Sequence, residues 1–162
     1  MLCNFQLARS VDMSFRMVNK EFKLVGIKGS GEFVHFGHEV PLLAKQLLSR
    51  SNEIPNSTET EIALFEPKKD ENHRTGYYYV GLTVSEKLDE VPTGMEYIET
   101  NKDYITTKGK IANLGKLHSN LLNWAEEQGY QRDLDSYIIE TYHPLGEGEE
   151  EVQIYLPIQA YK

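Results

Sequence analysis

The sequence is poor in the residues that build cross-links and membrane spans. It has one cysteine, Cys3, among 162 residues, which excludes an intrachain disulfide and a cysteine-based metal cluster. No segment approaches the roughly 20 apolar residues that cross a bilayer. The stretch from Met1 to Phe15 lacks the continuous apolar core of a secretory signal. A single thiol suits a reducing compartment, so we expect a cytoplasmic protein with no membrane partner.

Positive charge is also scarce. The chain has 17 Lys and Arg against 25 Asp and Glu, a formal net charge of -8, and no basic run longer than Lys68-Lys69. Binding to nucleic acid needs a basic patch, so we expect no direct nucleic-acid partner. The acidity permits a cationic ligand, although solvation of an ordinary surface is the plainer explanation of the charge.

Several catalytic and cofactor motifs are missing from the sequence. There is no Gly-x-Ser-x-Gly nucleophile elbow, no phosphate-binding glycine loop and no dinucleotide fingerprint. His35 and His38 are three residues apart, but the other histidines are dispersed, and a zinc site needs three or four converging ligands. We therefore expect neither a metal nor a cofactor.

A pattern of a strand, a helix and two strands occurs twice along the chain. Two glycine-ended strands align Lys28-Gly29 with Lys108-Gly109. Each is followed by an apolar helical stripe, and the second helix is expected to end at Gly129. Two further strands close each unit. In the first unit we expect a strand at 22–29, a helix at 39–48 and strands at 62–67 and 77–84. In the second unit we expect a strand at 103–109, a helix with its apolar stripe at 114–125, and strands at 139–144 and 152–158.

This pattern predicts an α+β fold made of duplicated β-α-β-β units. One such unit buries too little surface to be stable alone, whereas two units can share a sheet and a core. We expect a non-native or disordered tail at 1–15 and a single domain at 16–162. The first repeat spans about 20–84, a linker with Pro92 and Gly94 spans about 85–100, and the second repeat spans about 101–160.

Glu140 stands out as a candidate binding residue. Side chains alternate along a strand, so Glu140 shares a face with Ile138 and Tyr142 and takes the place that Ala63 has in the first repeat. A buried, unpaired carboxylate is unfavourable, and such a group would suit the cation of a ligand. A plain surface glutamate on a solvated sheet face is the alternative.

Aromatic residues are the second candidate feature. Aromatic faces attract cations by about 0.5 to 2 kcal/mol in partly desolvated sites, and they offer rigid apolar contact area. Core packing is the alternative for each residue taken singly. The candidates near the expected site are Tyr79, Tyr97, Tyr104, Trp124, Tyr142 and Tyr155.

Four segments of the second repeat carry a family resemblance. They are Tyr104–Gly109, Leu122–Gly129, Ile139–Tyr142 and Glu151–Ile158, of which the last is the most specific. They resemble the GyrI-like, or AraC-type, effector-binding family, and integron-cassette members look similar in length. The resemblance covers Phe15 to the C-terminus and is strongest from Tyr97 onward.

The resemblance implies a fold and a function. It implies two β-α-β-β units related by pseudo-two-fold symmetry, with a groove between them that binds lipophilic, often cationic, effectors or drugs. A buried glutamate contacts the cation in family members that regulate transcription, and Glu140 occupies the matching position. The sequence has no room for a helix-turn-helix, so we expect no DNA-binding domain. The remaining alternatives are ligand sequestration and sensing through a protein partner, a regulator or gyrase.

Three hypotheses about function follow. The first is a binding module in which an apolar cation packs on Trp124, Tyr104 and Tyr142, with its charge near Glu140. The second is a hydrolase of strained cyclopropane-bearing genotoxins, in which Glu140 is the general base and Tyr104 or Tyr142 assists the leaving group. The third is an acidic interaction module that resembles the gyrase inhibitors of the family.

Overall fold

A computed structural model of the protein describes residues 14–159. The expected tail at 1–15 therefore lies outside the described residues, apart from Ser14 and Phe15. Along the chain, the longer elements are β1 (Arg16–Glu32), α2 (Phe36–Leu48), β2 (Ser57–Phe65), β3 (Thr75–Val84), β4 (Glu96–Lys110), α3 (Leu114–Gln128), β5 (Ile138–Gly146) and β6 (Glu149–Pro157). Three short 3-10 segments, η1 (Phe33–His35), η2 (Ser51–Glu53) and η3 (Ile111–Asn113), join them.

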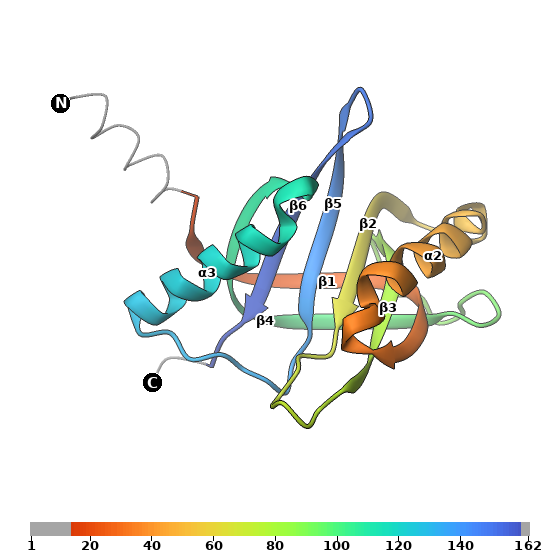
Figure 1. The fold of residues 1–162 in the computed structure, drawn as a ribbon. Coiled ribbons are helices and arrows are strands. Elements are labelled where there is room, and N and C mark those ends of the chain that lie inside the picture. The colour runs from red at the N-terminus through yellow and green to blue at the C-terminus, as the bar shows by residue number, and fades with distance from the viewer. Residues whose placement is uncertain (1–13, 160–162) are drawn as a thin grey trace.

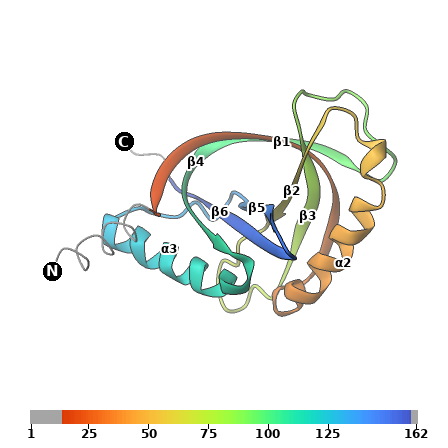
Figure 2. The same cartoon turned by 90° about the horizontal axis from the view of Figure 1, so that it is seen from above.

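The six strands form one closed barrel, in the order β1-β3-β2-β5-β6-β4. Every neighbouring pair is antiparallel. The two longest strands, β1 and β4, lie side by side and arch across one side of the barrel, as Figure 2 shows. The expected α+β class is confirmed, with two helices and six antiparallel strands among the described residues.

Alternation along the strands separates an inner face of the barrel from an outer face. The tyrosine run of β3 illustrates this alternation. Tyr79 is buried inside the barrel, whereas its neighbour Tyr78 is buried on the outer face, among the side chains that pack under α2. The inner cluster consists of Phe22, Leu24, Ile62, Leu64, Tyr79, Tyr104, Ile139 and Tyr155. The barrel is thus filled by aromatic and aliphatic side chains.

The two helices cover different parts of the outer face (Figure 1). Helix α2 packs on β1 and β3, where it buries Val40 and Leu47, and α3 packs on β4 and β6, where it buries Leu121 and Ala125. The strands β2 and β5 lie between the two helices (Figure 2). Neither helix has the length and apolar character needed to cross a membrane.

Two glycines explain how α3 is fitted to the barrel. A Cβ atom at Gly109 would lie 2.8 Å from Cδ2 of Leu117, so the missing side chain allows α3 to approach β4 closely. At its other end α3 stops at Gly129, which has a φ of 79° in the left-handed region that glycine adopts without strain. The expected helix end at Gly129 is therefore observed.

One expected boundary differs from the structure. The linker is expected at about 85–100, whereas β4 begins at Glu96, inside that range. The reason is a long-range pairing, because Tyr97 to Thr100 are register partners of Val25 to Phe22 on β1. Proline and glycine in the preceding residues marked the turn but gave no indication of where this pairing begins.

Candidate ligand-binding site

A cavity of about 760 Å³ lies between α2 and α3, over the outer face of β2 and β5. We call it the interhelical cavity. Its floor includes Ala63, Phe65 and Ile138 from the two strands. Apolar side chains of α2 form one wall and those of η3 and α3 the other, including Phe36, Val40, Ala44, Ile111 and Leu114. Its size falls within the range of about 300 to 1,000 Å³ of small-molecule sites in proteins.

Glu140 lies in the floor of this apolar cavity and is only 5% exposed. Each of its carboxylate oxygens has a polar partner. The Tyr142 hydroxyl donates to Oε1 at 2.6 Å, and Nε2 of His118 lies 2.7 Å from Oε2. The carboxylate is thus buried but not unpaired, which offsets part of the free-energy cost of removing it from water.

The Tyr142 hydroxyl is held in its protonated form. Burial, followed by the charge of the neighbouring Glu140 and the hydrogen bond to it, raises the pKa of Tyr142 well above its usual value. A neutral phenol can donate its proton to a carboxylate, whereas a phenolate cannot. Tyr142 is therefore a stable donor to Glu140 at all ordinary pH values.

Local sequence explains how these three side chains meet. Glu140 and Tyr142 are two residues apart on β5, so both project from the outer face of the strand. His118 lies on α3, four residues after Leu114 and three before Leu121, and thus on the apolar face of that helix. The face that packs α3 on the barrel therefore also carries the imidazole to the cavity.

Carboxylates outnumber amines around the interhelical cavity. Besides Glu140 the lining includes Glu61, Glu66 and Glu150, against Lys45 and Lys68. Burial, with a smaller contribution from the charge of Glu150, raises the pKa of Glu61. The cavity is therefore apolar in most of its wall and acidic in its charged groups.

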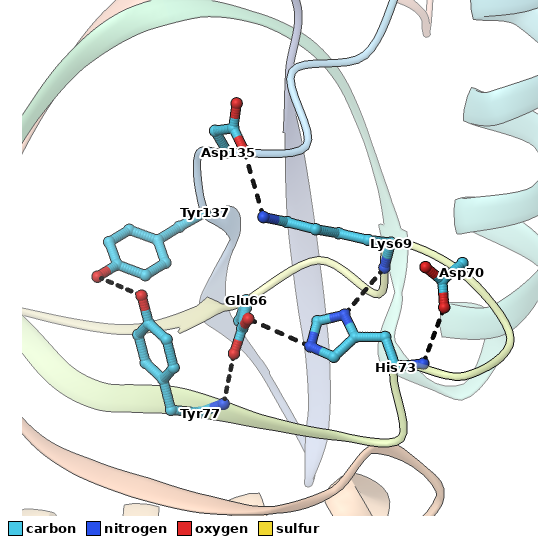
Figure 3. A network of polar contacts seen from close by, with 7 residues as sticks. All are labelled: Glu66, Lys69, Asp70, His73, Tyr77, Asp135 and Tyr137. Atoms are coloured by element: carbon cyan, nitrogen blue, oxygen red, sulfur yellow. Dashed lines mark hydrogen bonds and ion pairs between the residues drawn. The ribbon is translucent and has the colours of Figure 1, made fainter.

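A polar network supports the cavity where β2 leads into β3 (Figure 3). Glu66, which lines the cavity, accepts a hydrogen bond from the Tyr77 backbone N–H at 3.1 Å and lies 3.3 Å from Nε2 of His73. Lys69 extends to Asp135 at 3.3 Å, which ties this turn to the segment before β5. The network holds Glu66 in place at one end of the cavity.

The structure places the seven expected site residues in three different regions. Glu140 and Tyr142 line the interhelical cavity. Three tyrosines point to the inner face of the barrel, namely Tyr79, Tyr104 and Tyr155. The remaining two pack on the outer face away from the cavity lining: Trp124 lies against Phe15 and Tyr130, and the Tyr97 hydroxyl donates to Glu99 at 2.7 Å.

The division has a simple physical reason. Tyr104 and Tyr155 lie on β4 and β6, as expected, but their positions along these strands have the parity that faces the interior of a closed barrel. The phenol of Tyr104 is 1% exposed and shares a hydrogen bond with Thr100 at 2.7 Å. Core packing, which was the alternative interpretation of these aromatics, describes Tyr79, Tyr104 and Tyr155 in the structure.

Sequence reasoning missed several residues of the cavity. In the sequence His118 is one of several dispersed histidines, and the signal that could single it out is its place within the apolar stripe of α3. Phe36 and Ala44 on α2 and the acidic Glu61 were not singled out either. Their part in the cavity depends on how far α2 and α3 stand apart, which no pattern in either helix specifies.

A second hollow of about 360 Å³ lies elsewhere, beside β4 and the segment before β5. Its lining includes Tyr104, Tyr137, Thr100, Lys102 and Asp135. It lacks the apolar wall of the first cavity. Among residues 14–159, no group of three or more His, Cys, Asp or Glu side chains is arranged to hold a metal ion.

Comparison with solved structures supports the fold. The protein SAV2435, in a structure with bound tetraphenylphosphonium, is 12% identical to this chain, with a TM-score of 0.66 over 90% of this chain and 94% of that one. The integron cassette protein VCH_CASS2 from the mobile metagenome of Vibrio cholerae is 8% identical, with a TM-score of 0.57 over 90% and 96% of the two chains.

EcmrR, in a complex with DNA, is 13% identical, with a TM-score of 0.61, and the match covers 98% of this chain and 64% of that one. At such low identities these similarities show a shared fold alone. No curated protein sequence matches the chain.

Comparison with protein families gives a clear result. The GyrI-like small molecule binding domain matches residues 12–159, which is most of the chain. The family resemblance expected from the sequence is thereby confirmed, and the family's description fits a chain with a large apolar cavity between two helices. The protein belongs to the GyrI-like small molecule binding domain family.

Proposed function

We propose that the protein binds a lipophilic cation in the interhelical cavity, with Glu140 as the charge partner. The observation that carries this proposal is a carboxylate, 5% exposed, in the floor of a largely apolar cavity of about 760 Å³. An apolar body can fill such a cavity, and a positive charge can neutralise the carboxylate at its floor.

The neighbouring charges favour the same sign of ligand. Glu61, Glu66 and Glu150 line the cavity together with Glu140, whereas Lys45 and Lys68 are its only lysines among the described residues. An excess of carboxylates in a low-dielectric cleft attracts cations and disfavours anions. The bound tetraphenylphosphonium in the structure of SAV2435 is a ligand of this class.

We also propose that the two β-α-β-β units are repeats and that the cavity is the groove between them. The register of strand pairing supports this proposal. Ala63 faces Glu140 across β2 and β5, and these two residues are also matched in the sequence alignment of the units. Glu21 faces Asn101 across β1 and β4, and each lies seven residues before the lysine of its Lys-Gly pair. A two-fold axis through both pairs would exchange the units.

Calorimetric titration with tetraphenylphosphonium tests the proposed ligand class, with triphenylphosphine oxide as the neutral analogue of similar shape. We expect the cation to bind and to raise the melting temperature, since a ligand at 100 times its dissociation constant stabilises the folded state by about 2.7 kcal/mol. The neutral analogue should bind more weakly by about tenfold or more, the equivalent of about 1.4 kcal/mol.

The role of Glu140 is tested with Glu140→Gln, which removes the charge and keeps the shape. We expect this variant to lose most of the preference for the cation over the neutral analogue. Glu86→Gln is a matched control, because Glu86 is exposed and its replacement changes the net charge by the same amount. Equal cation binding by the wild type and Glu140→Gln would contradict the proposal.

A hydrolytic reaction in the same cavity is a second candidate. The observation that favours it is the contact of Glu140 with both an imidazole and a phenol, an arrangement that could hold a water molecule for attack on an electrophilic carbon. An enzyme would consume a strained cyclopropane-bearing substrate over many cycles, whereas a binding protein saturates at one equivalent. Turnover by the wild type and its loss in Glu140→Gln would favour the hydrolase.

A further inference from the structure

We propose that cation binding in the interhelical cavity releases a proton from His118. In the ligand-free protein the imidazolium of His118 is the counter-ion of Glu140, and the ligand cation takes its place. This inference rests on the proposed function and goes beyond it, because it makes His118 the residue that sets the pH dependence and the strength of cation binding.

The contacts of Glu140 leave little room for a further positive charge. Tyr142 hydrogen-bonds to one carboxylate oxygen and His118 contacts the other at 2.7 Å, and the residue is almost fully buried. Because both oxygens are engaged and the residue is almost fully buried, a ligand cation would reach the carboxylate most directly by taking the place of one of these partners.

His118 is the partner that can leave. Tyr142 is tied to the same strand as Glu140, and its proton is firmly held, since burial raises the pKa of its hydroxyl. The His118 side chain instead extends from α3 across to the floor of the cavity and is 26% exposed, against 6% for the side chain of Glu140. A small rotation about its side-chain bonds would break the contact with Glu140 without moving the helix, while the imidazole stays in the cavity wall beside the incoming cation.

Electrostatics couples this displacement to a proton. One buried carboxylate can balance one positive charge, so an imidazolium and a ligand cation side by side would repel each other in a site with little water. The exchange balances as written: the cation enters, the imidazolium becomes a neutral imidazole, and its proton passes to the buffer. The charge at the cavity floor then stays the same before and after binding.

Other ionisable groups face the same cavity and could contribute. They are Lys45 on α2, Glu61 on β2, Glu66 and Lys68 in the turn after β2, Tyr142 on β5 and Glu150 on β6. Glu61 is the main rival source of a proton, because burial and the charge of Glu150 raise its pKa. The two sources are separated by substitution, since only one of them contacts Glu140.

Titration calorimetry with tetraphenylphosphonium at about pH 6, where ordinary histidines are largely protonated, tests the proposal. Repeating the titration in buffers of different ionisation enthalpy gives the number of protons released. We expect the wild type to release most of one proton per cation bound. His118→Gln should release almost none and should bind the cation at least as tightly at this pH. His143→Gln is the matched control, because His143 is on β5 but contacts Thr141 rather than Glu140, and it should release as much as the wild type.

Each other outcome has a distinct meaning. Cation binding by the wild type without proton release would overturn this inference and leave the proposed function standing. Release that persists in His118→Gln but disappears in Glu61→Gln would overturn it in favour of Glu61. A folded wild type that binds no cation would overturn the proposed function and this inference together.

A measurement on the wild type tests the proposal even if the His118 variant does not fold. The Cε1 proton of His118, identified by backbone assignment, reports the charge of its ring in the NMR spectrum. On addition of tetraphenylphosphonium at about pH 6 we expect this signal to move to the position of a neutral imidazole. A signal that stays at the imidazolium position in the saturated complex would overturn the proposal.

Discussion

Ala63 and Glu140 are direct partners across β2 and β5, so the buried carboxylate stands beside one of the smallest side chains available to a strand. Ala63 is 1% exposed and lines the floor of the interhelical cavity. The space above Glu140 therefore depends on the small size of its partner. A larger residue at this position would project into the same space that a ligand would fill.

Replacing Ala63 with isoleucine should block the cavity while leaving the barrel intact. Ala63 is nearly fully buried beside Glu140, so the added atoms must push neighbouring groups aside, and we expect a loss of stability of about 1 to 3 kcal/mol. Binding of tetraphenylphosphonium should weaken by about tenfold or more, because the isoleucine side chain would occupy space in the cavity that the ligand needs. Ala112→Ile, at an exposed position of η3, is the control. Unchanged affinity in Ala63→Ile would show that the ligand binds elsewhere.

Two tyrosine-to-carboxylate hydrogen bonds in this protein differ chiefly in burial. Tyr142 donates to Glu140 and Tyr97 donates to Glu99, each across two residues of a strand. Tyr142→Phe should lower the free energy of unfolding by about 1.5 to 3 kcal/mol, since a buried carboxylate loses a donor. Tyr97→Phe should cost less than about 1 kcal/mol, since water can replace the donor at the exposed Glu99. Chemical denaturation measures both, and equal losses would contradict the burial of Glu140.

Two glycines offer a contrast between rigid and flexible surroundings. A Cβ atom at Gly26 would lie 2.6 Å from the backbone oxygen of Val80 on the neighbouring strand, which can move only if the sheet distorts. At Gly109 the clash is with the end of the Leu117 side chain, which can rotate. We expect Gly26→Ala to destabilise the protein by about 1 to 3 kcal/mol and Gly109→Ala by less than about 1 kcal/mol. Thermal unfolding would show the order, and the reverse order would contradict the β1–β3 register.

Alkaline pH should unfold the protein through its tyrosines. Burial raises the pKa of Tyr104 and Tyr142, and burial together with the hydrogen bond to Glu99 raises the pKa of Tyr97 to about 12. A phenol whose pKa is higher in the folded state stabilises the fold fully below its unfolded value of about 10. That contribution is lost as pH rises toward 12 and beyond.

Absorbance of tyrosinate near 295 nm checks this expectation. Among the 10 tyrosines, a fraction should ionise near pH 10 and the rest only at higher pH, together with the loss of far-ultraviolet circular dichroism. In denaturant all should ionise together near the ordinary value. Ionisation of every tyrosine near pH 10 in the folded protein would contradict the buried inner cluster.

Local patterns in the sequence were sufficient for much of the fold. The alternation of Ile138, Glu140 and Tyr142 against Ile139 placed the carboxylate and its phenol on one face, and the structure has them there. The apolar stripe of α3 and its end at Gly129 were also readable, because a 3.6-residue period and a left-handed glycine are properties of a single segment. The residues of the GyrI-like resemblance likewise lie in short, contiguous segments.

What the sequence determined by itself was therefore the class of fold, the family and the candidate acid at Glu140. Only the tertiary structure decided that the sheet closes into a barrel, which buries Tyr79, Tyr104 and Tyr155 inside and leaves Tyr142 at the cavity. It also decided that His118, 22 residues from Glu140 along the chain, becomes its partner. Strand parity separates two faces but does not say which face is enclosed, and the distance between two helices depends on contacts that neither helix contains alone.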